Sequence, residues 1–213
     1  MKTDDLVALL ARGPLEPAPD AAARRYGAGL AIGALLAAGL MVVELGVRAD
    51  LAVAMRWPMF WVKGAYVAAL AIAGLFVALR LSRPGRSLGW TPAWVAAPLL
   101  AMWLLAGAQL WQASPDQRSV LFYGDTWESC PWLIALLSTP VFVGVFWAMR
   151  GLAPTRLRLA GGAAGWLAGC TGALVYCLHC PELQAPFLGF WYLLGMLIPA
   201  VAGVWLGPRL LRW

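Results

Sequence analysis

Charge is scarce in this chain, and histidine is almost missing. Charged residues fill 12% of the 213 positions, whereas an ordinary soluble domain has about a quarter. His179 is the single histidine, which excludes a catalytic metal centre built from several imidazoles. The net charge of +6 is spread over short segments rather than gathered in one basic stretch. This distribution argues against direct binding of nucleic acid.

Apolar side chains dominate instead. They make up 62% of the residues, and the mean hydropathy is +0.74. A membrane-spanning helix needs roughly 20 mainly apolar residues, and six runs of about that length are present. They are Tyr26–Val47, Pro58–Leu79, Pro92–Trp111, Pro131–Met149, Leu159–Leu178 and Phe187–Leu206. We therefore predict an all-α polytopic membrane protein, a bundle of six transmembrane helices embedded in a lipid bilayer.

Lysine and arginine collect in alternate gaps between the apolar runs. Twelve of the 16 basic residues lie in the N-terminal segment, the second and fourth connecting loops and the C-terminus. Positively charged loops tend to remain in the cytoplasm, so we predict that both termini are cytoplasmic. We divide the chain into a cytoplasmic segment, residues 1–25, and a transmembrane domain, residues 26–213.

Two cysteines fall at the predicted outer surface. Cys130 opens the fourth helix, Cys180 follows the fifth, and each precedes a proline. A reversible disulfide between them requires Cα atoms within about 7 Å and an oxidising compartment. The alternative is two interfacial cysteines without a partner.

Neighbouring residues suggest two further kinds of chemistry. Cys130, His179, Cys180 and Glu182 offer thiolate, imidazole and carboxylate groups, which suit a soft or borderline metal ion. Consecutive residues point in different directions, however, so the set does not have to converge. Cys177 and Cys180 form a C-x-x-C pair, although Cys177 also fits as a small packing residue inside the helix.

Two charges are embedded in the apolar runs. Glu44 lies late in the first run and Lys63 early in the second. A hydrogen-bonded pair between them would lower the cost of placing each charge in the membrane. Alternatively, Lys63 extends to the interface beside Trp57 and Trp61.

Glycines recur every four residues in two of the runs, at Gly29 and Gly33 and at Gly161, Gly165 and Gly169. Such spacing lets helix backbones approach closely. The ladders therefore mark either packing within one bundle or a dimer interface.

The N-terminal segment has the pattern of a short amphipathic helix followed by a stiff tether. Thr3 is a candidate N-cap, and Asp4 and Asp5 suit the first helical turn. Leu6, Leu9 and Leu10 then share one face, and prolines follow at positions 14, 17 and 19. A helix of this length is marginal alone, so we expect it to order on a partner, to lie on the membrane or to stay unfolded.

Seven segments resemble the NrsF-type anti-sigma factors along nearly the whole chain. They are the opening MKTDDLVALLA, FWVKGAY (Phe60–Tyr66), SCPW (Ser129–Trp132), ALLSTPVF (Ala135–Phe142), LAPTR (Leu152–Arg156), HCPE (His179–Glu182) and APFLGFWYLLG (Ala185–Gly195). That family comprises six-helix proteins of the bacterial inner membrane that hold an extracytoplasmic-function sigma factor. The resemblance implies that Thr3, Asp4, Asp5, Leu6, Leu9 and Leu10 contact the sigma factor. It also implies that Cys130 and Cys180 take part in stress sensing.

The sequence thus predicts a regulator rather than an enzyme, with no resident cofactor. A heavy-metal ion would bind the outer cysteines only transiently. The alternative function is a membrane thiol–disulfide oxidoreductase that uses Cys177, Cys180 and Cys130. This alternative lacks a second reactive pair in the outer loops.

Overall fold

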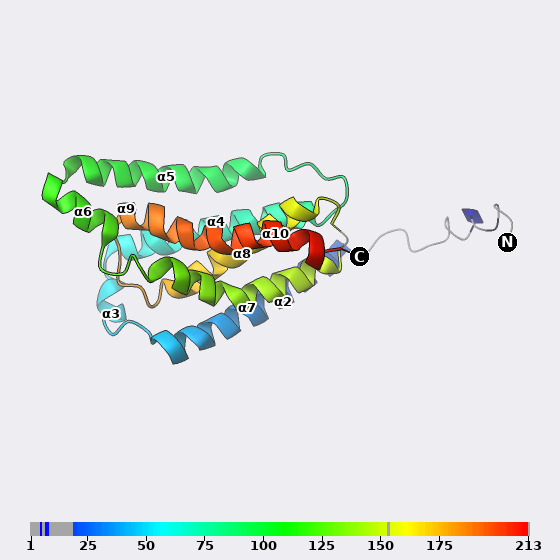
Figure 1. Cartoon of the computed structure of the whole chain (residues 1–213), viewed down its shortest axis with the longest axis horizontal. Coiled ribbons are helices and arrows are strands. Elements are labelled where there is room, and N and C mark those ends of the chain that lie inside the picture. Colours follow the sequence, from blue (N-terminus) through cyan, green and yellow to red (C-terminus); the bar gives the residue numbers. More distant parts are fainter. Residues whose placement is uncertain (1–4, 6, 9–18, 153, 213) are drawn as a thin grey trace.

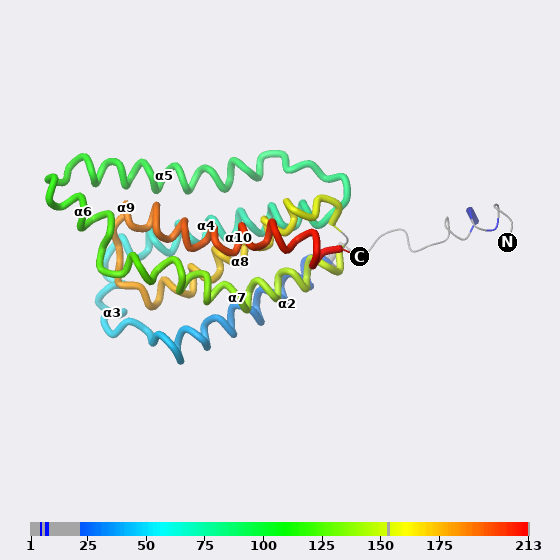
Figure 2. Tube along the Cα trace, viewed as in Figure 1, coloured from blue at the N-terminus to red at the C-terminus, as the bar shows by residue number. Residues whose placement is uncertain are grey.

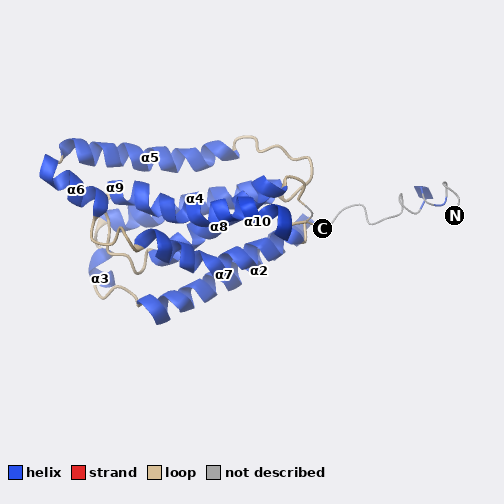
Figure 3. Cartoon of the chain, viewed as in Figure 1, coloured by secondary structure: helices blue, strands red, loops and turns tan. Residues whose placement is uncertain are grey.

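The computed structural model describes residues 5, 7–8, 19–152 and 154–212. Asp5 is helical and exposed. The other residues predicted to contact a sigma factor, Thr3, Asp4, Leu6, Leu9 and Leu10, lie outside the described residues. The described part contains helices and loops and no strands (Figure 3).

Six helices are long and apolar enough to cross a membrane, which confirms the predicted fold class. The first consists of α2 (Pro19–Leu40) and a π-helical end, η1 (Met41–Leu45). The sixth joins α9 (Ala185–Phe187), the π-helix η2 (Leu188–Tyr192) and α10 (Leu193–Leu210). The others are α4 (Pro58–Leu81), α5 (Thr91–Gln112), α7 (Cys130–Arg150) and α8 (Leu157–Tyr176).

Proline sets the start of several of these helices. Pro58, Pro92, Pro131 and Pro186 each occupy the first or second position of a helix. The missing N–H of proline costs little there because the first turn has no intrahelical acceptor. These residues explain why the predicted boundaries fall close to the observed ones.

Two short helices lie in loops where the sequence did not predict them. They are α3 (Leu51–Ala54) and α6 (Pro115–Tyr123). Ser114 and Gln117 form a capping box at the start of α6, which satisfies two backbone N–H groups that the helix itself leaves free.

The helix α8 lies at the centre of the bundle and α5 at its edge (Figures 1 and 2). In the most apolar stretch of each helix, 67% of the α8 residues are buried, against 6% in α5. Both glycine ladders pack inside the bundle. A Cβ at Gly169 would lie 2.6 Å from the carbonyl oxygen of Met196, and one at Gly33 would lie 2.7 Å from the Cα of Val141. Close packing within one chain therefore accounts for both ladders.

The two ends of the bundle differ in charge. The start of α2, the end of α10 and the α4–α5 and α7–α8 loops share one end (Figure 1). We call this the arginine-rich end, because it carries Arg24, Arg25, Arg80, Arg83, Arg86, Arg150, Arg156, Arg158, Arg209 and Arg212. From residue 21 onward, all six carboxylates belong to segments at the opposite end, namely Glu44, Asp50, Asp116, Asp125, Glu128 and Glu182. We call this the thiol end, because Cys130 and Cys180 lie there.

Candidate functional site: the thiol end of the bundle

Cys130 and Cys180 lie together at the thiol end. Cys130 is the first residue of α7, and Cys180 lies in the loop between α8 and α9. Both side chains are fully buried, and the two thiols are close enough to influence each other's ionisation. All four cysteines of the chain are free thiols in this structure. The fold thus brings together two residues that are 50 positions apart in the sequence.

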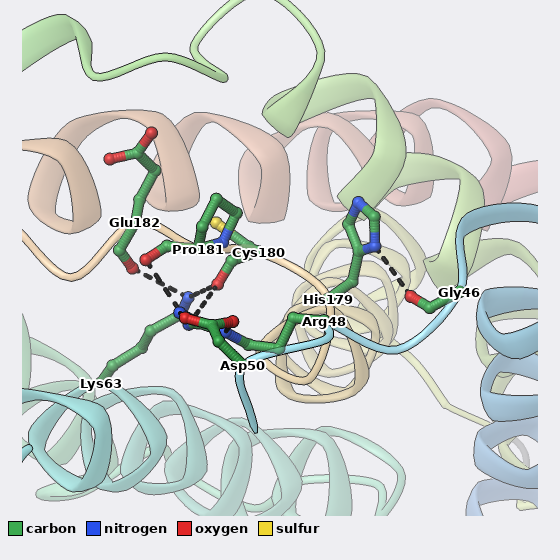
Figure 4. A network of polar contacts seen from close by, with 8 residues as sticks. All are labelled: Gly46, Arg48, Asp50, Lys63, His179, Cys180, Pro181 and Glu182. Carbon is green, nitrogen blue, oxygen red and sulfur yellow. Dashed lines mark hydrogen bonds and ion pairs between the residues drawn. The ribbon is translucent and has the colours of Figure 1, made fainter. Parts of the chain in front are cut away.

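Lys63 reaches from α4 into the same loop (Figure 4). Its ammonium group donates hydrogen bonds to the carbonyl oxygens of Cys180 at 2.9 Å and Glu182 at 3.0 Å. It also lies 5.0 Å from the centre of the Tyr192 ring, a distance at which a cation is attracted to the aromatic face. The side chain is 0% exposed. Lys63 therefore binds the backbone of the loop from inside the protein.

This placement corrects both expectations for Lys63. Glu44 is exposed on η1 and forms no ion pair with Lys63. The buried ammonium group also does not extend to the surface beside Trp57 and Trp61. The carbonyl groups that follow α8 replace the predicted partners, since the C-terminal end of a helix and its loop offer partial negative charge.

Arg48 ties the segment after η1 to the same loop. Its guanidinium group binds both carboxylate oxygens of Asp50 at 2.7 Å. It also donates to the carbonyl oxygens of Cys180 at 3.3 Å and Pro181 at 3.5 Å. Arg48 and Lys63 thus share the carbonyl of Cys180, and each also binds a neighbouring carbonyl of the loop (Figure 4).

The His179 ring and the Glu182 carboxylate point to different neighbours. His179 Nδ1 lies 2.9 Å from the carbonyl oxygen of Gly46. Glu182 accepts a hydrogen bond from the backbone N–H of Asp125 at 2.8 Å. Burial raises the pKa of Glu182, and the hydrogen bond from Asp125 offsets this only in part. The carboxylate also lies against Gly124, where a Cβ would be 2.6 Å from Glu182 Oε2 and φ is +56°, so glycine suits this turn.

The surroundings of Cys180 favour its thiolate form. Burial acts to raise the pKa of Cys180, but several neighbours outweigh it. These are the Cys130 thiol, the positive charge of Lys63, the Tyr192 hydroxyl and the backbone N–H of Glu182. The net result is a pKa below the usual thiol value. Tyr192 Oη lies beside the sulfur but makes no hydrogen bond of good geometry.

The predicted metal-ligand set does not assemble. Among the described residues, no group of three or more His, Cys, Asp or Glu side chains is arranged to hold a metal ion. Of Cys130, His179, Cys180 and Glu182, the structure brings together only the two thiols. Neighbouring residues in a chain point in different directions, and here the side chains of His179 and Glu182 point away from the Cys180 sulfur.

Sequence reasoning missed three members of the site, namely Arg48, Tyr176 and Tyr192. Tyr176 and Tyr192 are almost fully buried, and both interact with the thiols. A buried tyrosine has no distinctive sequence signature in an apolar helix. Arg48 and Asp50 did carry a signal, because they are two opposite charges in a short loop of a charge-poor chain.

Known proteins resemble this chain from end to end. A family described as "Negative regulator of sigma F" (NrsF) matches residues 10–213. The chain is 56% identical over 213 residues to the probable anti-sigma-F factor NrsF of Azospira oryzae, covering 100% of both proteins. It is 41% identical over 221 residues to the anti-sigma-F factor NrsF of Caulobacter vibrioides, again covering 100% of both. No solved structure matches. The chain therefore belongs to the NrsF family, as its seven sequence segments predicted.

Proposed function

We propose that this protein is a membrane-bound anti-sigma factor that holds an extracytoplasmic-function sigma factor and releases it under thiol-directed stress. The anti-sigma function is supported by sequence identities of 56% and 41%, over the full length of the chain, to two proteins named anti-sigma-F factor. A protein of this kind regulates transcription by binding and is not an enzyme.

The sigma factor would bind at the arginine-rich end. Ten arginines there favour the cytoplasmic side of a bacterial inner membrane. The segment with Thr3, Asp4, Asp5, Leu6, Leu9 and Leu10 precedes α2 in the sequence, and α2 begins at this end. In our proposal its leucine face docks in a groove of the sigma factor, as amphipathic helices commonly do.

Cys130 and Cys180 would sense the stress on the opposite, periplasmic side. The Cys180 thiolate attacks a peroxide oxygen, the O–O bond breaks and a sulfenic acid forms while hydroxide leaves. The Cys130 thiol then attacks that sulfur, and its proton leaves with the hydroxyl group as water. The two sulfurs lose two electrons to the peroxide and form a disulfide. A thiol-seeking heavy-metal ion is a second reagent of this class, since thiolate is its preferred partner.

Release requires two arrangements of the bundle with different affinities for the sigma factor. The disulfide would connect α7 to the loop after α8, and α8 packs against α4, α7 and α10. A change at this position therefore reaches most of the bundle. A coupling of about 1–3 kcal/mol between the two ends, as is common between distant sites, would suffice for regulation.

The alternative, a thiol–disulfide oxidoreductase, gains no support from the structure. Such an enzyme must present its cysteines to substrate thiols. Cys177 is 5% exposed, and Cys130 and Cys180 are 0% exposed.

A reporter gene that depends on the sigma factor tests the proposal. Deleting the protein should turn the reporter on without stress, and a reporter that stays off would refute the anti-sigma function. Changing Cys130 and Cys180 together to Ser should abolish the change in reporter output that peroxide causes. The matched control changes Cys170 and Cys177 to Ser and should respond like the wild type. A normal peroxide response in the Cys130/Cys180 variant would remove the sensing role.

Binding and topology have separate tests. Changing Asp4 and Asp5 to Lys should release the sigma factor in a pull-down, and full retention would rule out that docking segment. A reporter fused after residue 213 should remain in the cytoplasm, whereas its export would invert the proposed orientation.

A further inference from the structure

Lys63 is a buried cation that has no carboxylate partner among the described residues. Its side chain is 0% exposed and contacts two carbonyl oxygens and one aromatic ring. Among the residues that the structure describes, the one ion pair joins Arg48 and Asp50. A buried charge without a counter-ion is strongly unfavourable, so the surroundings of Lys63 need an anion.

No carboxylate of the described residues pairs with Lys63. Asp50 binds Arg48 through both oxygens. The Glu182 carboxylate accepts from the backbone of Asp125, although the carbonyl of the same residue binds Lys63. Glu44 is exposed on η1.

The charge of Lys63 acts on the thiols of Cys130, Cys177 and Cys180, and of these only Cys180 belongs to the segment that Lys63 binds. The Cys180 carbonyl oxygen lies 2.9 Å from Lys63 Nζ, and the charge of Lys63 acts on the sulfur. Cys130 and the backbone N–H of Glu182 supply this sulfur with further donors, and the Tyr192 hydroxyl lies beside it. Such a set of donors stabilises an anion.

We propose that the Cys180 thiolate is the counter-ion of the Lys63 ammonium group, and that oxidation loosens the thiol end by removing this negative charge. The regulatory half of this inference rests on the proposed sensing role of Cys180. The ion pair itself does not depend on that role.

The charge balance of the oxidation supports this mechanism. One thiolate, one thiol and one peroxide give one disulfide, one water and one hydroxide. The negative charge thus leaves the protein with hydroxide, while the ammonium group stays behind. The disulfide leaves Lys63 with two carbonyls and a ring, which do not neutralise a buried charge.

The orphaned ammonium group would then move toward water and break its bonds to the loop. The carbonyl of Cys180 then loses the hydrogen bond from Lys63 and keeps the one from Arg48. The carbonyl of Glu182 loses its hydrogen bond from Lys63. A disulfide usually stabilises a protein. Here its formation is expected to destabilise the thiol end.

A double-mutant cycle on the purified full-length protein in lipid nanodiscs tests the ion pair. Four proteins are compared under reducing conditions: wild type, Cys180→Ser, Lys63→Met and the double variant. Cys180→Ser leaves Lys63 without its counter-ion and should lower Tm by roughly 4 °C. Adding Lys63→Met to Cys180→Ser should raise Tm again. The matched control pairs Lys63→Met with Cys170→Ser, a thiol on which the charge of Lys63 does not act, so the two shifts should add.

An equal Tm loss from Lys63→Met in the wild-type and Cys180→Ser backgrounds would overturn the ion pair, because Lys63 would then serve only to bind carbonyls. If Lys63→Met alone gives no folded protein, the double variant decides. It should fold if the charges are partners, and failure to fold would count against the pairing.

Oxidation tests the regulatory half. Peroxide should lower the Tm of the wild type, and this drop should vanish in Lys63→Met, where no cation is left unpaired. A drop of the same size in Lys63→Met would overturn the mechanism of release. These measurements use no sigma factor, so they fail or succeed independently of the reporter experiment.

Discussion

The helices at the arginine-rich end approach one another backbone to backbone, whereas the thiol end is tied by hydrogen bonds that converge on one loop. At the first end, Gly161 of α8 faces Gly203 and Gly207 of α10. At the second, Lys63, Arg48 and the backbone of Asp125 all bind the segment from Cys180 to Glu182.

These two kinds of contact respond differently to chemistry. Glycine contacts depend on shape alone, so neither an oxidant nor a proton alters them. The contacts at the thiol end depend on charges that oxidation or titration can remove. We infer that the arginine-rich end is the fixed end of the bundle and the thiol end is the responsive one, and three measurements test this difference.

The largest effect is expected at the fixed end. In Gly161→Leu, the new side chain would overlap the backbone of Gly203, and its Cβ would lie 2.8 Å from the Cα of Gly207. Because backbone cannot move aside easily, we expect a loss of about 3 kcal/mol in the free energy of unfolding. Denaturant unfolding in detergent measures it.

Gly162→Leu is the matched control on the same helix. Its Cβ would meet the end of the Val204 side chain at 2.8 Å, and the nearest backbone atom is the Ala200 carbonyl oxygen at 3.9 Å, so no backbone has to move. If Gly162→Leu lowers the free energy of unfolding as much as Gly161→Leu does, the glycine contact is not what stabilises the arginine-rich end.

An intermediate effect is expected from the buried hydrogen bond between Tyr26 and Ser82. The two hydroxyl oxygens lie 2.8 Å apart, and Ser82 also donates to the Ala78 carbonyl. Tyr26→Phe should therefore lower stability by about 1 kcal/mol. The effect of peroxide on Tm should stay unchanged, since this bond lies at the fixed end. A peroxide effect that disappears with Tyr26→Phe would show that the two ends do not act separately.

The smallest effect is a pH dependence from Glu182. Its pKa is raised in the folded protein, mainly by burial, so the folded state holds the proton at a pH where the unfolded chain has lost it. Stability should therefore fall as pH rises from the ordinary value of 4.5 toward the folded pKa. Melting curves across this range should show the slope in the wild type and lose it in Glu182→Gln. An unchanged slope in the variant would assign it to another group.

The fold was predictable because lipid imposes simple rules on sequence. A run of about 20 apolar residues has to span, and Pro58 or Pro131 marks where a helix begins. The helix α6 was missed because its residues lack an apolar stripe, although Ser114, Pro115 and Gln117 carry a local N-terminal signal.

The sequence predicted where the thiols of the site lie but not which groups its charged side chains bind. Alternate charged loops and helix lengths assign Cys130 and Cys180 to one end of the bundle. The partners of Lys63 are backbone carbonyls of Cys180 and Glu182, and every residue type has such a carbonyl. The sequence therefore offered Glu44, a carboxylate, as a partner for Lys63, because backbone carbonyl partners cannot be recognised from residue types.

The π-helix η2 gives the sixth span one residue to spare. A π-helical turn bonds residue i to residue i+5, so η2 holds one residue more than an α-helical turn needs. Deleting one residue between Leu188 and Tyr192 would close this wide turn into an ordinary α-helix and keep Gly195, Gly203 and Gly207 facing the helices that they contact. A deletion within α10 would instead turn the glycines that follow it by about 100°, so it should be far more harmful than the same deletion in η2.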